Sequence, residues 1–222
     1  MSSIYYNDDL MHHIESYFFR PKTKKELTDA INFYYSNKEK GIEKYGIINN
    51  WDVSHITDMS KLFYYLNYFN EPINLWDTSN VTSMKEMFSH AKLFNQPLDK
   101  WNVSKVNNME SMFNNAVSFD QELNSWNTSR VNIMTAMFCN AKNFNKPIKL
   151  WDTSQVRKMN YMFSGAELFN QSINLWNISN VQDMYCMFFG AKKFNESDNL
   201  FSLSNAQSNL DVDRMFYKVF FI

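Results

Sequence analysis

The stretch Trp101-Asn-Val-Ser-Lys-Val-Asn-Asn-Met-Glu-Ser-Met-Phe-Asn-Asn-Ala-Val-Ser-Phe119 is one copy of a pattern that recurs along the chain. Each copy begins with a tryptophan, and the six tryptophans lie 25 residues apart at every step, so we number each copy from its tryptophan as position 1. A strict period of this length indicates a stack of coils, because one unit cannot close an apolar core without its neighbours. The tryptophans are Trp51, Trp76, Trp101, Trp126, Trp151 and Trp176.

Four apolar positions of the repeat predict a short helix. Position 9 is Met and position 13 is Phe in every copy, while position 12 is Met and position 16 is Ala in every copy except the first. These positions are related as i, i+3, i+4 and i+7, which is the spacing of one helix face. We therefore expect about two turns of helix with this face directed inward.

Apolar residues at positions 23, 1 and 3 predict a short strand, in a pattern similar to the strand portion of leucine-rich repeats. Turn residues at positions 20 to 22, as in Asn95-Gln96-Pro97, separate the expected helix from this strand. The predicted fold class is an α/β solenoid, a leucine-rich-repeat-like right-handed coil of short parallel strands and short helices. We expect the Ser at position 4 and the Asn or Asp at position 20 to satisfy backbone groups at the turns.

The two ends of the chain depart from the repeat and predict caps, because terminal coils would otherwise expose apolar faces. Residues 1–47 form the expected helical N-terminal cap, with a capping box at Thr23-Lys-Lys-Glu26 that begins a helix over residues 23–36. An earlier short helix is expected over residues 8–18.

The six repeats occupy residues 48–200. Residues 201–222 are expected to form a degenerate repeat and a C-terminal cap, in which Met215-Phe216 arrive three residues late.

Composition excludes several classes of protein. The chain has 222 residues with 22 basic and 23 acidic side chains, and this balance argues against a nucleic-acid partner. No apolar run reaches the roughly 18 residues of a membrane span. The first residues lack a basic start followed by an apolar stretch, so we expect no signal peptide and favour an intracellular or virion-associated location over secretion.

No catalytic or metal-binding constellation stands out, so we expect a non-enzymatic protein without cofactor or metal. None of the four histidines has a metal-ligand spacing to Cys, Asp or Glu. Cys139 and Cys186 lie about two coils apart, which predicts a separation of roughly 10 Å or more and two reduced thiols. The Asp or Asn at position 2 of each repeat is compatible with a cation-binding row or with turn and ladder bonding, and we favour the second because it follows from the repeat itself. The histidines are His12, His13, His55 and His90.

Exposed positions that vary between copies are the candidate partner surface, since they are free of the packing requirement. Position 5 differs from copy to copy, and four basic side chains at positions 5, 7 and 8 are expected to gather into a modest basic stripe. A second candidate is a tyrosine cluster of the first copy, Tyr64, Tyr65 and Tyr68, for which packing against the N-terminal cap is the alternative. The candidate partner-binding residues are His55, Lys105, Arg130, Gln155, Arg157 and Lys158.

The repeat Trp-(Asp/Asn)-(Val/Thr)-Ser-x-Val-x-x-Met-x-x-Met-Phe-x-x-Ala-x-x-Phe-Asn resembles the BspA-like leucine-rich-repeat surface proteins, over about residues 21–200. This domain was first catalogued from mycoplasmas as a protein of unknown function, and similar repeats occur in large DNA viruses. The resemblance implies a non-enzymatic, protein-binding solenoid, which in bacteria is often displayed on the surface and adhesive. Residues 7–17 share only the beginning of an F-box pattern, whose later part is missing.

The expected function is that of a non-catalytic protein–protein interaction module with a protein partner of unknown identity. One alternative is a structural, self-associating component of a virion or surface layer. Another is a surface adhesin, as in the bacterial members of the family.

Overall fold

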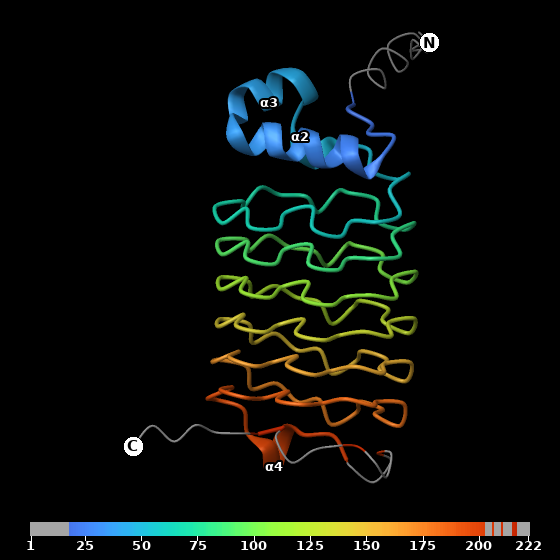
Figure 1. The fold of residues 1–222 in the computed structure, drawn as a ribbon, viewed down its shortest axis with the longest axis vertical. Helices are drawn as coiled ribbons and strands as arrows, with labels where there is room; N and C mark the ends of the chain where they lie inside the picture. Colours follow the sequence, from blue (N-terminus) through green and yellow to red (C-terminus); the bar gives the residue numbers. More distant parts are fainter. Residues whose placement is uncertain (1–17, 203–205, 207–209, 211–214, 217–222) are drawn as a thin grey trace, which may run out of the picture.

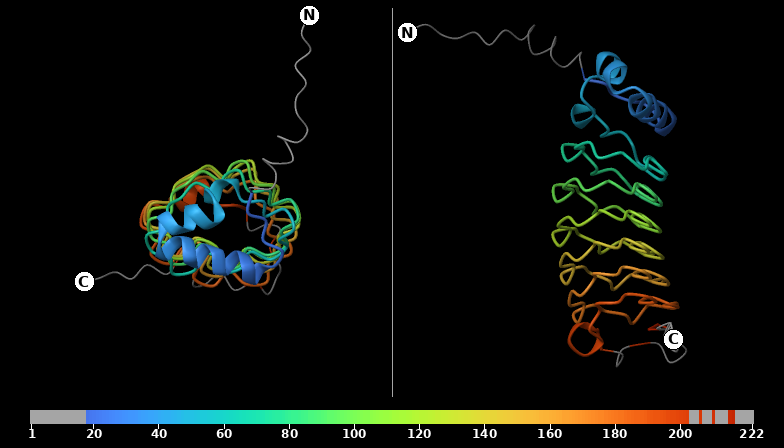
Figure 2. Two further views of the ribbon diagram at one scale, coloured as in Figure 1. Left: turned by 90° about the horizontal axis from the view of Figure 1, so that it is seen from above. Right: turned by 90° about the vertical axis from the view of Figure 1, so that its left-hand side faces the viewer.

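The computed structural model describes residues 18–202, 206, 210, 215 and 216. Three predictions therefore fall outside the described residues. They concern the helix over residues 8–18, of which only Phe18 is described, the segment compared with an F-box, and His12 and His13. The described chain forms a helical cap followed by an elongated stack of coils (Figure 1). Viewed along the stack, the coils superimpose on one another (Figure 2).

The cap contains two packed helices, α2 (Lys24–Ser36) and α3 (Lys38–Tyr45), followed by the 3-10 helix η1 (Ile48–Asn50). The predicted helix start is confirmed, because the Thr23 side chain accepts a hydrogen bond from the Glu26 backbone N–H at 3.1 Å. The return contact of the predicted capping box is displaced by one residue, since Glu26 Oε2 accepts from the Lys22 N–H at 2.8 Å. The buried side of α2 consists of Leu27, Ala30, Ile31 and Tyr34.

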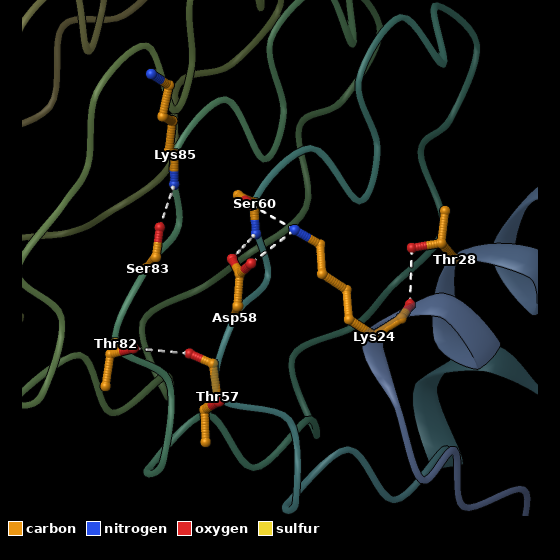
Figure 3. A network of polar contacts seen from close by, with 8 residues as sticks. All are labelled: Lys24, Thr28, Thr57, Asp58, Ser60, Thr82, Ser83 and Lys85. Carbon is orange, nitrogen blue, oxygen red and sulfur yellow. Dashed lines mark hydrogen bonds and ion pairs between the residues drawn. The ribbon is translucent and has the colours of Figure 1, made fainter.

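The cap is joined to the first coil by polar contacts (Figure 3). Lys24 Nζ of α2 lies 2.8 Å from Asp58 Oδ2 and also donates to Ser60 Oγ. Asp58 is held in turn by the Ser60 backbone N–H, which donates to Asp58 Oδ1 at 2.8 Å. On the apolar side, the rings of Tyr34 and Trp51 meet edge to face at 5.8 Å.

The predicted strands and the α/β solenoid class are wrong. Within the described residues no strand is present, and each pair of neighbouring coils shares a single parallel bridge at position 8, such as Asp58 with Ser83. The physical reason is that backbone groups expected in a ladder close turns within their own coil. The Trp76 N–H donates to the Ile73 carbonyl at 3.2 Å, and the Val81 N–H donates to the Thr78 carbonyl at 2.9 Å.

The helix predicted over positions 9 to 16 is also wrong, because these residues form overlapping turns. In the second coil the Met87 N–H donates to the Met84 carbonyl at 3.2 Å, within the coil, whereas the Phe88 N–H donates to the Met112 carbonyl of the next coil at 2.9 Å. Glu86 and His90 have φ values of 55° and 63°, which end any helical continuation and suit the third residue of a type II turn.

The inward direction of the apolar positions is nevertheless confirmed. Positions 9, 12, 13 and 16 are buried in the second to sixth coils. Two turns join positions 9 and 12 and positions 13 and 16, and the four residues at their ends all lie in the core, as residues on one helix face would. The apolar spacing thus placed the core correctly, although the helix inferred from it is wrong.

The core consists of columns in which each side chain packs on its own copy. The Phe113 ring stacks between Phe88 and Phe138, with centroids 5.5 Å apart on both sides. The column continues into the degenerate last repeat, where Phe216 stacks on Phe188 at 5.2 Å. Beside it, α4 (Glu196–Asn199) replaces the turn of the sixth coil.

Candidate functional site

The candidate site is the surface formed by positions 5, 7 and 8 of the coils, which we name the groove face. Positions 5 and 7 flank position 6, whose Val or Ile is buried in every coil. In the third coil the turn that joins the Val103 carbonyl to the Val106 N–H at 2.9 Å holds Lys105 on the outside. All six of the predicted partner-binding residues are exposed.

A shallow, open groove of about 710 Å³ runs across the groove face from the second to the fifth coil. It brings together three of the predicted residues, Lys105, Arg130 and Gln155, from three successive coils. Sequence reasoning did not assign the other lining residues to a partner surface, although Thr82, Asn107 and Asn132 share position 7 with Arg157. The groove is lined by Thr82, Lys105, Asn107, Ser129, Arg130, Asn132, Asp152, Ser154 and Gln155.

Of the other three predicted residues, two follow closely after Gln155 in the fifth coil and one lies away from the groove. Arg157 follows Asn132 in the column of position 7, and its backbone N–H donates to the Asn132 carbonyl at 2.8 Å. Lys158 forms the parallel bridge with Ile133 of the preceding coil. His55 does not join the cluster, because it belongs to the first coil, two coils before Lys105.

The basic residues of the groove face lack acidic partners. Within the part of the chain that the structure describes, none of Lys105, Arg130, Arg157 and Lys158 forms an ion pair. Lys105 Nζ donates instead to Asn80 Oδ1 at 2.7 Å. Positive charge therefore gathers here without direct ion pairs, with Asp152 as the acidic residue among those that line the groove.

Elsewhere on the stack, several charges pair from coil to coil. Lys85 Nζ lies 2.9 Å from Glu110 Oε2. Glu167 lies between Lys142 at 2.9 Å and Lys192 at 2.7 Å. Hydrogen bonds from Lys192 and then Lys142 lower the pKa of Glu167, so this carboxylate stays ionised in neutral solution.

The Asp and Asn residues at position 2 form local turns, which bears out the interpretation favoured from sequence over a cation row. In every coil the position 2 side chain accepts a hydrogen bond from the backbone N–H of the Ser at position 4, as Asp152 does from Ser154 at 2.9 Å.

The position 20 side chains form a ladder along the stack. The Asn170 backbone N–H donates to Asn145 Oδ1 at 2.8 Å, and each neighbouring pair of coils repeats this contact.

The tyrosine cluster of the first coil is exposed and extends further than predicted. Tyr68 is 77% exposed, and its contact with the cap is a hydrogen bond from its backbone N–H to the Tyr35 hydroxyl at 3.3 Å. Tyr65 stacks on His90 with ring centroids 4.1 Å apart. Partial burial and then Lys92 lower the pKa of His90, which keeps the ring neutral at pH 7. The contact between Tyr65 and His90 could have been predicted from the sequence, because both residues occupy position 15 of neighbouring copies.

Groups able to support chemistry are sparse on the described part of the chain. Across residues 18–202 and the few described beyond them, no three His, Cys, Asp or Glu side chains lie close enough to hold a metal ion. Both cysteines are free, and burial raises the pKa of the Cys139 thiol, although a hydrogen bond with Ser164 opposes this. Among the helices described, none has the length and apolar character needed to cross a membrane.

The uniform interior and the variable groove face define a repeat protein built from stacked 25-residue coils. The chain belongs to the family described as "Mycoplasma protein of unknown function, DUF285", whose model matches residues 30–138 and again residues 121–220. The family resemblance seen in the repeat pattern is thereby confirmed. No curated protein and no solved structure matches the chain.

Proposed function

We propose that the chain is a non-catalytic repeat protein that binds another protein through the groove face. The observation that carries this proposal is the groove itself, where exposed cations of successive coils gather without ion pairs over a regular apolar core. Side chains there differ in charge and size between coils, while the positions buried in every coil stay apolar or Thr. Variation at exposed positions over a regular core is what a repeat scaffold needs in order to recognise a specific partner.

The uncompensated charge favours binding over a purely structural role for this face. Coils that only stack on one another gain from pairing their charges, as they do at Glu110 and Glu167. Cations left without carboxylates are available to steer and orient a partner.

The test is a quantitative affinity capture from native lysate with three forms of the chain as bait. The groove variant carries Lys105→Ser, Arg130→Ser and Arg157→Ser. The matched control carries Lys61→Ser, Lys142→Ser and Lys192→Ser, which removes three exposed charges elsewhere. A protein retained by the intact chain and the control but lost with the groove variant supports the proposal.

Two other outcomes would contradict it. Equal retention by all three baits would mean that the groove face does not bind the partner. Recovery of nothing except the chain itself, together with concentration-dependent mass in sedimentation, would favour a self-associating structural protein.

A further inference from the structure

The groove has a chemistry that specifies the kind of segment it fits. Lys105 and Arg130 line it on successive coils, and the exposed Arg157 and Lys158 follow closely after the lining residue Gln155 on the next coil. We propose that the groove binds an acidic, extended polypeptide segment of the partner. This inference rests on the proposed function and specifies which part of the partner is recognised.

Charge complementarity selects an anionic segment. These four cations are the ones left without carboxylates on this face, whereas Lys85, Lys142 and Lys192 are neutralised by neighbouring coils. Glutamate and aspartate side chains of a partner would provide the ion pairs that the chain itself provides on its other faces.

The length of the basic cluster suits a short polypeptide. In this part of the stack the rings of successive coils are 5.5 Å and 5.7 Å apart, between Phe113 and Phe138 and between Phe138 and Phe163. Two coil steps, from the coil of Lys105 to that of Arg157, therefore rise by roughly 11 Å, which an extended segment covers in three to four residues at ~3.3 Å each. A nucleic acid would need a longer row of cations, and the chain has a net charge of -1.

The floor of the groove provides polar partners for a peptide backbone. Ser129, Asn132 and Gln155 line the groove together with the cations. The Ser129 hydroxyl and the Asn132 amide N–H already donate to Asn127 Oδ1 and to the Gln155 carbonyl, and their side-chain oxygens can accept from backbone N–H groups of a ligand. Asp152 at one side of the groove already accepts a hydrogen bond from the Ser154 N–H at 2.9 Å, and its charge repels carboxylates. Acidic side chains of the ligand are thus directed away from position 2 and toward positions 5 and 7.

The test is a fluorescence anisotropy titration with the full chain and three probes. The first probe is a labelled peptide of alternating glutamate and serine, and the second has glutamine in place of every glutamate. The third is a single-stranded oligothymidylate of similar length. Each is titrated against the intact chain, the groove variant and the charge-matched control variant, at low and physiological ionic strength.

We expect the glutamate peptide to bind the intact chain and the control alike, and the groove variant about tenfold more weakly or worse. The glutamine peptide should not bind, and added salt should weaken binding to the intact chain more than binding to the groove variant. Matching far-ultraviolet circular dichroism spectra of the three forms would show that all are folded.

Several results would overturn the inference. Absence of glutamate-peptide binding up to about 1 mM would do so, as would equal affinity for the groove variant. Tighter binding of the oligothymidylate would assign the groove to nucleic acid instead. If the lysate capture still lost its protein with the groove variant while the glutamate peptide failed to bind, the proposed function would stand and the acidic ligand alone would be wrong.

Discussion

The interior of the stack and the groove face differ in how strictly they repeat. Position 13 is Phe in all six coils, and its rings stack with centroids 5.2 to 5.7 Å apart. Position 5 carries His, Asn, Lys, Arg and Gln in different coils. A buried side chain touches its own copy on both sides, so a change there disturbs two coil junctions, whereas an exposed one has no such constraint. Stability is therefore expected to depend on the interior and recognition on the face.

The largest expected effect is that of truncating a central ring. Phe113 is fully buried and also stacks on Phe119 of its own coil at 4.0 Å. Phe113→Ala should lower the free energy of unfolding by about 3 to 5 kcal/mol, because the cavity cannot close between two stacked coils. Urea denaturation followed by tryptophan fluorescence measures this loss. A loss below about 0.5 kcal/mol, as at a surface site, would show that position 13 is not core.

How far the sequence predicts this fold depends on what determines each feature. Side-chain burial follows from the apolar pattern, so the inward positions and the Thr23 cap were predictable. Backbone pairing was not, because the Phe88 N–H binds the Met112 carbonyl of another coil and this alternation leaves no trace in apolar spacing. The helix α3 was missed, although Asn37, whose side chain accepts from the Lys40 N–H at 3.0 Å, is a capping residue visible in sequence.

The candidate site shows the same division. Residues 25 apart in the sequence lie on neighbouring coils, so the proximity of Lys105 and Arg130 could be predicted from the repeat period. That neither forms an ion pair within the described residues, although Asp152 also lines the groove, depends on the paths of long side chains, and the groove depends on how turns project Ser129 and Asn132. These features follow from the three-dimensional arrangement of the coils.

A repeated polar ladder at the surface should have an intermediate effect. Asn145 Oδ1 accepts from the Asn170 backbone N–H at 2.8 Å and from Gln171 Nε2 at 3.0 Å. Asn145→Ala leaves both donors without this acceptor and should cost about 1 to 2 kcal/mol in urea denaturation. Lys149→Ala, nearby and outside the ladder, is the control. Equal stability of the two variants would mean that the ladder is replaced by water without loss.

A smaller, pH-dependent effect is expected where the cap meets the stack. Burial raises the pKa of Asp58, but hydrogen bonds from Lys24 and Ser60 outweigh it and bring the pKa below its ordinary value. A lowered pKa in the folded state means that the contribution of Asp58 to stability is complete above the ordinary value of about 3.9 and is lost as the pH falls through the lowered pKa. Because the pair is partly exposed, this contribution is about 1 kcal/mol or less.

The measurement compares the intact chain with Asp58→Asn in urea at neutral pH and at about pH 2. The variant should be less stable at neutral pH, and the difference should vanish in acid. A difference that persisted in acid would show that Asp58 acts through its shape or its hydrogen bonds with Ser60 and not through its charge.

The smallest expected effect on stability belongs to the groove variant, in which Lys105, Arg130 and Arg157 become Ser. All three side chains are exposed, and within the described residues none has an ion pair to lose, so the free energy of unfolding should change by less than about 0.5 kcal/mol per site. Removing mutually repelling cations from neighbouring coils should even raise stability slightly at low salt. The control variant loses ion pairs with Glu86 and Glu167 and should be the less stable of the two. Urea denaturation of both variants at low salt checks this order. The reverse order would mean that the groove cations stabilise the coils themselves, and the separation between a stabilising interior and a recognising face would fail at this surface.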